Sequence, residues 1–279
     1  MISNLTDKTI FFIAGDGNLP ITLYKSLQES KNKIFVFSMH HEKEMFENCK
    51  NYKKINFSKM GYLLSQFKKH KPTHFTMGGG VKFNGLSRII RGLIFHPIWL
   101  FKILRLIKTV KIKGDNGYLE LLHYFLEKEF NAKILSTTDI DKKLTDFDNI
   151  NKALFKGYEN DAKLGFNLIN AISAFDVGQA VVIQEQRVIA IEAQEGTQNM
   201  IKRCAELKLK SSLKPILVKK TKLNQDKNID LPTIGIETVK DCCSTGFAGI
   251  VIERNNTIVL DKDEIIAFLE KKSFFVVVL

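Results

Sequence analysis

Apolar residues in the first part of the chain form short runs separated by polar, helix-period segments. The pattern predicts strands at residues 9–14, 33–38 and 73–77, with helices at 19–30 and 61–70 between them. Strands that alternate with helices are typical of a parallel α/β sheet. We therefore expect a parallel sheet in the N-terminal part of the chain.

The pattern continues with a helix at 115–131 and a last strand of this domain at 132–136. Residues 139–160 are rich in Asp, Asn and Lys and are predicted to be a linker between an N-terminal domain, 1–138, and a C-terminal domain, 161–279. The C-terminal domain is predicted to be mixed α/β. Its expected elements are a helix at 160–174, two strands around the turn 184–186, a helix at 197–209, a strand at 214–219, a helix at 236–245, strands at 249–253 and 257–260 joined as a hairpin at Asn255-Asn256, a helix at 262–271 and a strand at 274–278.

Two glycine-rich turns follow predicted strands of the N-terminal domain. Gly15 and Gly17 come after the first strand, and Gly78 and Gly79 begin a run of three glycines after the strand at 73–77. Glycines at a strand end let the backbone approach a phosphate, and ligands of parallel sheets bind beyond the carboxyl ends of the strands. The third glycine of a dinucleotide fingerprint is missing. The pattern fits a nucleotide-contacting turn and a plain tight turn equally well.

The chain is strongly basic, with a formal net charge of +12. This charge favours anionic partners, such as phosphorylated small molecules, an acidic membrane surface or nucleic acid. No helix-turn-helix, RNP or zinc-finger signature is present, so nucleic acid is the weakest of these alternatives and is not an expected partner.

One segment, residues 71–114, contains no Asp or Glu and alternates basic with apolar residues around Trp99. Such a stretch is typical of an element that lies at an anionic bilayer or grips a lipid-linked phosphate. It is equally typical of a helix that packs on the core and presents a solvated basic face. The longest uncharged run here is broken by Pro97, so no membrane span is expected.

Cysteine and histidine chemistry is not favoured by the pattern. No signal peptide is visible, and the four cysteines form no C-x-x-C pair, so reduced, buried thiols in a cytoplasmic protein are expected. His70 and His74 are separated by Pro72 and do not share a helix face, which argues against a histidine-based zinc site.

Carboxylates in the second half are the stronger candidates for chemistry. Asp176, Glu192, Glu195, Asp226 and Asp230 fall at predicted strand ends or in one loop. Carboxylate oxygens together with substrate phosphate oxygens suit Mg²⁺. The nearby basic side chains are Lys219, Lys220 and Lys222, and Gly196-Thr197 begins a helix that could accept a phosphate. By spacing alone, surface carboxylates that balance surface lysines are the favoured reading.

Several motifs in this half together resemble one family. They are Asp176-Val177-Gly178-Gln179, Glu195-Gly196-Thr197, Gln225-Asp226 and Asp230-Leu231-Pro232-Thr233-Ile234-Gly235. With the two N-terminal glycine turns, the chain is similar along nearly its whole length to the UDP-2,3-diacylglucosamine pyrophosphatases of the LpxI type.

The resemblance implies an enzyme of lipid A synthesis in Gram-negative bacteria. It would hydrolyse UDP-2,3-diacylglucosamine to UMP and 2,3-diacylglucosamine 1-phosphate (lipid X), with Mg²⁺ and a water nucleophile. A Rossmann-like N-terminal domain and a catalytic C-terminal domain would hold the lipid between them. The resemblance also implies a homodimer in the cytoplasm, with peripheral contact to the inner membrane.

The resemblance maps the family's essential aspartate onto Asp230. From this match and the carboxylates of the same loop, Asp230 and Asp226 are expected to be catalytic and to hold the metal. The residues expected to contact substrate are Gly15, Gly17, Gly78, Gly79, Gln179, Glu195, Gly196, Thr197, Lys219 and Thr233. The alternative is a non-catalytic protein that binds an anionic lipid or a nucleotide.

Overall fold

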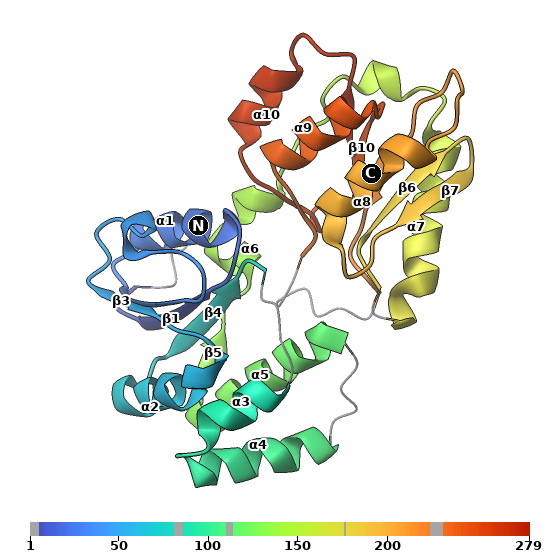
Figure 1. Ribbon diagram of the computed structural model, residues 1–279. Helices are drawn as coiled ribbons and strands as arrows, with labels where there is room; N and C mark the ends of the chain where they lie inside the picture. Colours follow the sequence, from blue (N-terminus) through green and yellow to red (C-terminus); the bar gives the residue numbers. More distant parts are fainter. Residues whose placement is uncertain (1–5, 81–85, 110–113, 176, 224–230) are drawn as a thin grey trace. The chain divides into compact units, whose positions relative to one another are not determined.

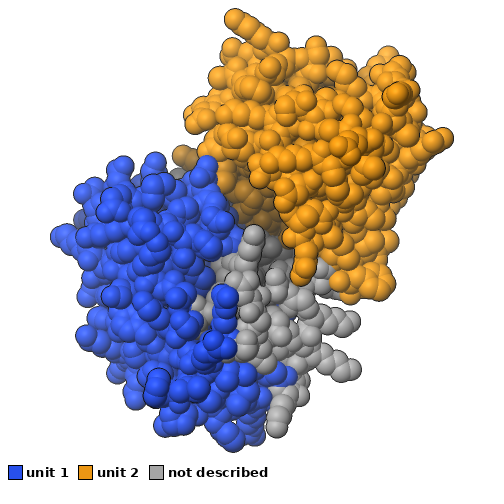
Figure 2. Space-filling view, viewed as in Figure 1, with its two compact units in different colours: residues 1–142 blue, residues 143–279 orange. Residues whose placement is uncertain are grey.

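The computed structural model describes residues 6–80, 86–109, 114–175, 177–223 and 231–279. The chain divides into two compact units, Met1–Lys142 and Lys143–Leu279 (Figure 2). The division falls inside the range 139–160, where the sequence analysis places a linker. Each unit has its own sheet and its own hydrophobic core.

The first unit alternates strands with helices (Figure 1). Its elements are β1 (Thr9–Ala14), α1 (Leu19–Gln28), β2 (Lys33–Ser38), β3 (Asn51–Lys54), α2 (Met60–His70), β4 (His74–Gly78), α3 (Leu86–Leu93), α4 (Pro97–Thr109), α5 (Gly114–Phe130), β5 (Lys133–Ile134) and α6 (Thr137–Ile140). Short 3₁₀ turns lie at Lys43–Met45 and Phe57–Lys59.

The five strands form a parallel sheet in the order β3-β2-β1-β4-β5. β1 is central, and its residues Ile10 to Ala14 are fully buried because both faces of the sheet are covered. Phe11 and Ile13 face a core shared with α2 to α5. Phe12 contacts the ring of Phe46 on the other face, where Leu23 of α1 reaches Gly78.

The strands that follow β1 in the sequence lie on both sides of it, so the sheet has a switch point between β1 and β4. The chain leaves β1 toward β2 and β3 on one side, and returns through β4 and β5 on the other. Ligands of doubly wound sheets bind at such a switch point, outside the carboxyl ends of the strands. The predicted Rossmann-like parallel sheet is therefore confirmed, and both glycine turns lie at its switch point.

The second unit contains a mixed sheet and a small separate one. Its elements are α7 (Glu159–Ile172), β6 (Ala180–Gln184), β7 (Arg187–Ile191), α8 (Gly196–Leu207), β8 (Ile216–Lys219), β9 (Thr233–Ile234), α9 (Ile236–Thr245), β10 (Gly249–Ile252), β11 (Ile258–Val259), α10 (Lys262–Leu269) and β12 (Phe275–Val278). The 3₁₀ turns of this unit are Lys142–Thr145, which starts at the last residue of the first unit, Lys152–Phe155 and Ser173–Phe175.

The main sheet has the order β12-β10-β8-β6-β7. β8, β10 and β12 are parallel, whereas β6 runs antiparallel to both β8 and β7. α8, α9 and α10 pack on one face, and α7 packs on the other. Gly165 lets α7 approach the sheet closely, because a Cβ there would lie 2.7 Å from a methyl group of Val218. The predicted mixed α/β unit is confirmed.

The predicted hairpin at Asn255-Asn256 is wrong. β10 lies between β8 and β12, so both of its edges are already hydrogen-bonded. β11 instead pairs in parallel with β9 in a separate two-stranded sheet. The asparagines form a turn, in which Asn255 has a φ of 58°, but the turn leads away from β10.

Candidate functional site

Charged and polar residues of the second unit collect at one edge of its main sheet, namely the edge formed by the ends of its strands and not by an outermost strand. β7, β8 and β10 all end at this edge, and β6 begins there. Glu192 follows β7, Lys219 is the last residue of β8, and Glu253 follows β10. This edge is the place where a sheet of this kind binds ligands.

Glu192 is held by donors from two directions. One carboxylate oxygen accepts from the backbone N–H of Gln179 at 2.8 Å, and the other accepts from the hydroxyl of Thr197. Gly178 makes room for this side chain, because a Cβ at Gly178 would lie 2.5 Å from the Cβ and Cγ of Glu192. Glu192 thus ties the start of α8 to the start of β6.

Lys219 extends this arrangement. Its side chain is 6% exposed, and its Nζ donates to the hydroxyl of Thr197 at 3.0 Å and to the carbonyl of Thr233 at 2.9 Å. A buried ammonium needs such partners, because desolvation of an unpaired charge is costly. The ammonium has three N–H donors, of which two serve these acceptors within the described residues. A third N–H of this kind can serve an oxygen of a ligand at the edge of the sheet.

We call Glu192, Thr197 and Lys219 the edge network. The edge network lies at the N-terminus of α8. The backbone N–H groups of the first turn of this 12-residue helix carry a partial positive charge, which adds to the charge of Lys219. The predicted site residues Gln179, Gly196, Thr197, Lys219 and Thr233 therefore lie together at this edge of the main sheet, although Gly196 and Thr197 belong to α8 and Thr233 to the separate β9–β11 sheet. Chemically, the arrangement suits the oxygens of a phosphate.

Glu195, also predicted for the site, pairs elsewhere. Its carboxylate lies 2.9 Å from Nη2 of Arg203, which also donates to the carbonyl of Ile191. A hydrogen bond from its own backbone, together with Arg203, lowers the pKa of Glu195. Glu195 is the N-cap residue of α8 but makes no side-chain cap, and its ion pair with Arg203 spans the first two turns of the helix.

A second charged pair lies at the same edge. Nζ of Lys220 is 2.7 Å from Glu253, whose other oxygen accepts from the backbone N–H of Thr221. The hydroxyl of Thr221 donates to the carbonyl of Asn256, and the N–H of Leu223 donates to the hydroxyl of Ser173. The chain that leaves β8 is thereby anchored up to Leu223.

The predicted catalytic residues Asp226 and Asp230, and the candidate carboxylate Asp176, lie outside the described residues. The chain resumes at Leu231 and Pro232, which are buried, and the carbonyl of Pro232 accepts from the N–H of Ile258. The described residues on either side of this stretch are thus hydrogen-bonded, Leu223 to Ser173 and Pro232 to Ile258.

The described carboxylates of this edge are engaged by protein donors and do not form a metal site by themselves. No group of three or more His, Cys, Asp or Glu side chains that could hold a metal occurs within the described ranges. Glu192 and Glu253 each have both oxygens occupied by protein donors. The described part of the edge thus supplies donors for phosphate oxygens, and metal ligation would depend on Asp226 and Asp230.

The N-terminal glycine turns meet each other at the switch point. The N–H of Gly15 donates to the carbonyl of Gly78, and Asp16 and Gly80 exchange two backbone hydrogen bonds. A Cβ at Gly15 would lie 2.6 Å from the carbonyl oxygen of Gly80, and Gly79 has a φ of +86°. These glycines are required by the contact between the two turns, whatever ligand they also admit.

Gly17 differs from the other predicted glycines. Its φ is +85°, its carbonyl contacts Nε2 of His41 at 2.9 Å, and no other atom lies within 4 Å of a Cβ built on it. Its conformation is what requires glycine, and the space beside it is open. This turn is the more accessible part of the switch point.

Sequence reasoning did not include some residues that shape these sites. Glu192 was noted as a carboxylate but not placed in the site, and Gly178, Lys220 and Glu253 were not assigned to it. Their common signal is a charged residue directly after a strand, or a glycine two residues before one. The partnerships themselves join positions 13 to 33 residues apart, which no spacing rule reveals.

Comparison with known proteins places both units in the same family. The model of the LpxI N-terminal domain matches residues 9–144, and the model of the LpxI C-terminal domain matches residues 150–277. One curated relative is the UDP-2,3-diacylglucosamine pyrophosphatase LpxI of Caulobacter vibrioides, 35% identical over 122 residues. That alignment covers 42% of this chain and 43% of the relative, so it spans less than half of each protein.

Proposed function

The chain belongs to the LpxI family, and from this premise we propose that it hydrolyses the pyrophosphate bond of UDP-2,3-diacylglucosamine. The products would be UMP and 2,3-diacylglucosamine 1-phosphate. The relative from Caulobacter vibrioides carries the name of this activity. The observation that carries the proposal is the edge network, in which Lys219 and the start of α8 offer donors to a phosphate.

We assign the chemistry to residues on both sides of this edge. Lys219, Thr197 and the first amides of α8 would bind and orient the phosphate oxygens, where fixed donors stabilise the charge that develops as phosphorus is attacked. Thr233 would act through its carbonyl, which holds Lys219 in place. Asp230 would orient the attacking water, and Asp226 would lie beside it.

Mg²⁺ is part of the proposal, with Asp226 and Asp230 as its protein ligands. A bound Mg²⁺ would neutralise negative charge on the phosphoryl oxygens. Gln179 and Glu195 would border the substrate, and Gly15, Gly17, Gly78 and Gly79 would receive its nucleotide or phosphate at the switch point of the first unit. We further propose a homodimer in the cytoplasm that contacts the inner membrane, because a substrate with two acyl chains is a membrane lipid.

The test is release of UMP from UDP-2,3-diacylglucosamine with and without Mg²⁺. We expect Asp230→Asn to lower kcat by about 100-fold or more, as for loss of a group that handles a proton in the reaction. Asp263→Asn is the matched control, since Asp263 is exposed on α10. Full activity of Asp230→Asn, or no UMP from the wild type, would contradict the proposal. Tight binding of the substrate without turnover would support the alternative, a non-catalytic binding protein.

A further inference from the structure

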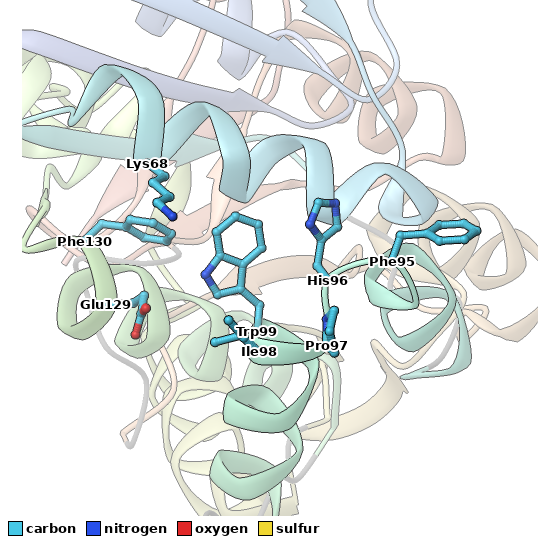
Figure 3. Close-up of a pocket in the computed structure, with 8 residues that line it drawn as sticks. All are labelled: Lys68, Phe95, His96, Pro97, Ile98, Trp99, Glu129 and Phe130. Carbon is cyan, nitrogen blue, oxygen red and sulfur yellow. The ribbon is translucent and has the colours of Figure 1, made fainter.

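Helices α3 and α4 have an inner face that packs on the first unit. Leu93 and Ile103 are buried in its core, and Trp99 and Leu100 pack against them. Trp99 and His96 turn toward α2 and border a pocket of about 460 Å³ with Lys68 and Phe130 (Figure 3). The single tryptophan of the chain is thus used to seat α4 on the core.

Large apolar side chains are also exposed to solvent in the turn between α3 and α4 and along α4, which a helix on a soluble core does not require. Phe95 is 90% exposed, Ile98 71% and Phe101 68%. We call the exposed apolar residues here the outer ridge. They are Ile94, Phe95, Ile98, Phe101 and Leu104. A contiguous group of large exposed apolar side chains marks an interaction surface.

Cations surround the outer ridge. Arg88, Arg91, Lys102 and Arg105 are exposed on α3 and α4. Lys102 and Arg105 also border a shallow pocket of about 470 Å³, on the far side of which lie Tyr124 and Lys128 of α5. Glu129 pairs with Lys102, and residues 71–114 contain no acidic residue at all. The surface therefore combines apolar side chains with a net positive charge.

We propose that the outer ridge docks this protein on an anionic phospholipid bilayer. Ile98 and Phe101 enter the boundary between headgroups and acyl chains, while Arg105 and its neighbours bind lipid phosphates. The long stems of these cations lie along the apolar surface and keep their charges at headgroup level. No helix in the described part of the chain is long and apolar enough to cross a membrane, so the contact is a surface one.

Charge also argues against a second copy of the chain as the occupant. A two-fold interface brings the same patch of both subunits together. Here it would oppose the cations of α3 and α4 with their own copies, and juxtaposed like charges are unfavourable. An anionic lipid surface meets both requirements of the ridge, because it neutralises the cations and accepts the apolar side chains.

The inference rests on the membrane contact proposed above and is tested without turnover. The full chain is floated with vesicles of equal parts phosphatidylglycerol and phosphatidylethanolamine, and with pure phosphatidylcholine vesicles. We expect binding to the anionic vesicles that weakens with salt. Ile98→Ser should lower the partition coefficient about tenfold, since it removes an apolar side chain from the lipid. Ile266→Ser, at an exposed isoleucine of α10, is the matched control and should bind as the wild type does.

The role of charge is tested with a second pair of variants. Arg105→Gln should weaken binding to anionic vesicles by about fivefold, the effect of one cation near such a surface. Arg187→Gln changes an exposed arginine of β7 and should leave binding unchanged. Equal binding of the two variants would contradict the proposed contact with lipid phosphates.

Two outcomes would overturn the docking proposal. One is wild-type protein that does not float with anionic vesicles. The other is an Ile98→Ser variant that binds like the wild type but changes from dimer to monomer in analytical ultracentrifugation, which would make the ridge a subunit interface. Release of UMP from detergent-dispersed substrate is measured in parallel. Turnover without vesicle binding removes only the docking, and ridge-dependent binding without turnover removes only the hydrolysis.

Discussion

Thr197 joins the two charged members of the edge network through one hydroxyl group. The hydroxyl donates to Glu192 and accepts from the ammonium of Lys219 at 3.0 Å. A hydroxyl has one donor and two acceptor positions, so it can serve both partners at once. Serine is the only other small side chain that offers the same pair of roles.

At this residue, Thr197→Val tests whether the hydroxyl positions the site. Valine has nearly the shape of threonine but removes one of the two donors to Glu192 and one of the two acceptors of Lys219, which keep only Gln179 and Thr233 as partners. We expect kcat/KM for UMP release to fall at least about tenfold, and the free energy of unfolding to fall by about 1–3 kcal/mol, the cost of buried polar groups that lose a partner. Urea titration and steady-state kinetics measure the two effects.

Thr197→Ser separates positioning from packing. Serine keeps the hydroxyl and loses one methyl group, so activity should stay within about threefold of the wild type while a small loss of stability remains. If Thr197→Ser were as inactive as Thr197→Val, the methyl group and not the hydroxyl would be the important feature.

At the scale of single residues, the sequence predicted which residue types lie at the site but not which partners they contact. The Gly196-Thr197 pair was predicted to cap a helix or contact phosphate from its position alone, and the structure adds its partners. Lys219 lies 22 residues away along the chain, and only the pairing of β6 with both β7 and β8 brings the two together. Residue types are visible in a sequence, whereas partners depend on strand order.

Among the elements, the β6–β7 hairpin has the clearest local determinants. Its two turn residues, Glu185 and Gln186, both have positive φ, 51° and 59°. Asp161 of α7 is buried and accepts from both of their backbone N–H groups, at 3.0 and 2.6 Å. A two-residue turn with positive φ at both positions matches the twist of the strands. This turn contains neither asparagine nor glycine, the residues that adopt positive φ at the least cost.

Gln186→Gly should therefore stabilise the protein. Glycine adopts positive φ without the steric cost that glutamine pays there, and the backbone N–H that Asp161 accepts is retained. We expect the free energy of unfolding in urea to rise by about 0.5–1 kcal/mol. Gln198→Gly is the control, because Gln198 lies in α8 and glycine there should destabilise by about 1 kcal/mol. A loss of stability in Gln186→Gly would contradict the strain argument.

Element by element, the sequence predicted buried structure well and exposed structure poorly. β1 and β2 have the predicted bounds, because long apolar runs leave few alternatives. β3 (Asn51–Lys54) was not predicted, since it is an edge strand whose two lysines are exposed. The strand after β10 was predicted but paired wrongly, because the Asn-Asn signal for a turn does not say which sheet the next strand joins.

At the scale of the whole chain, the second unit begins before its first helix. The backbone of Ile150 exchanges two hydrogen bonds with Val276 of β12, and Asn149 accepts from the N–H of Val278. The side chain of Asn151 donates to the carbonyls of Lys272 and Phe274. Residues 149–151 were assigned to a polar linker from composition, yet they close the edge of the main sheet, because their polar groups serve its backbone.

The boundaries of the second unit predict which fragment folds. Residues 143–279 contain the whole main sheet, its helices and the strip 149–151, so we expect a single cooperative urea transition followed by circular dichroism. Residues 152–279 lack both the strip and Phe147, which leaves β12 with an open edge and exposes the apolar core side chains that Phe147 packs against. We expect this shorter fragment to be less stable by at least about 2 kcal/mol, from several lost hydrogen bonds of about 0.5–1.5 kcal/mol each.

Asn151→Ala in the longer fragment should lower its free energy of unfolding by part of that amount. Equal stability of the two fragments would mean that the strip does not contribute to the unit, and absence of a cooperative transition in 143–279 would mean that the unit does not fold alone.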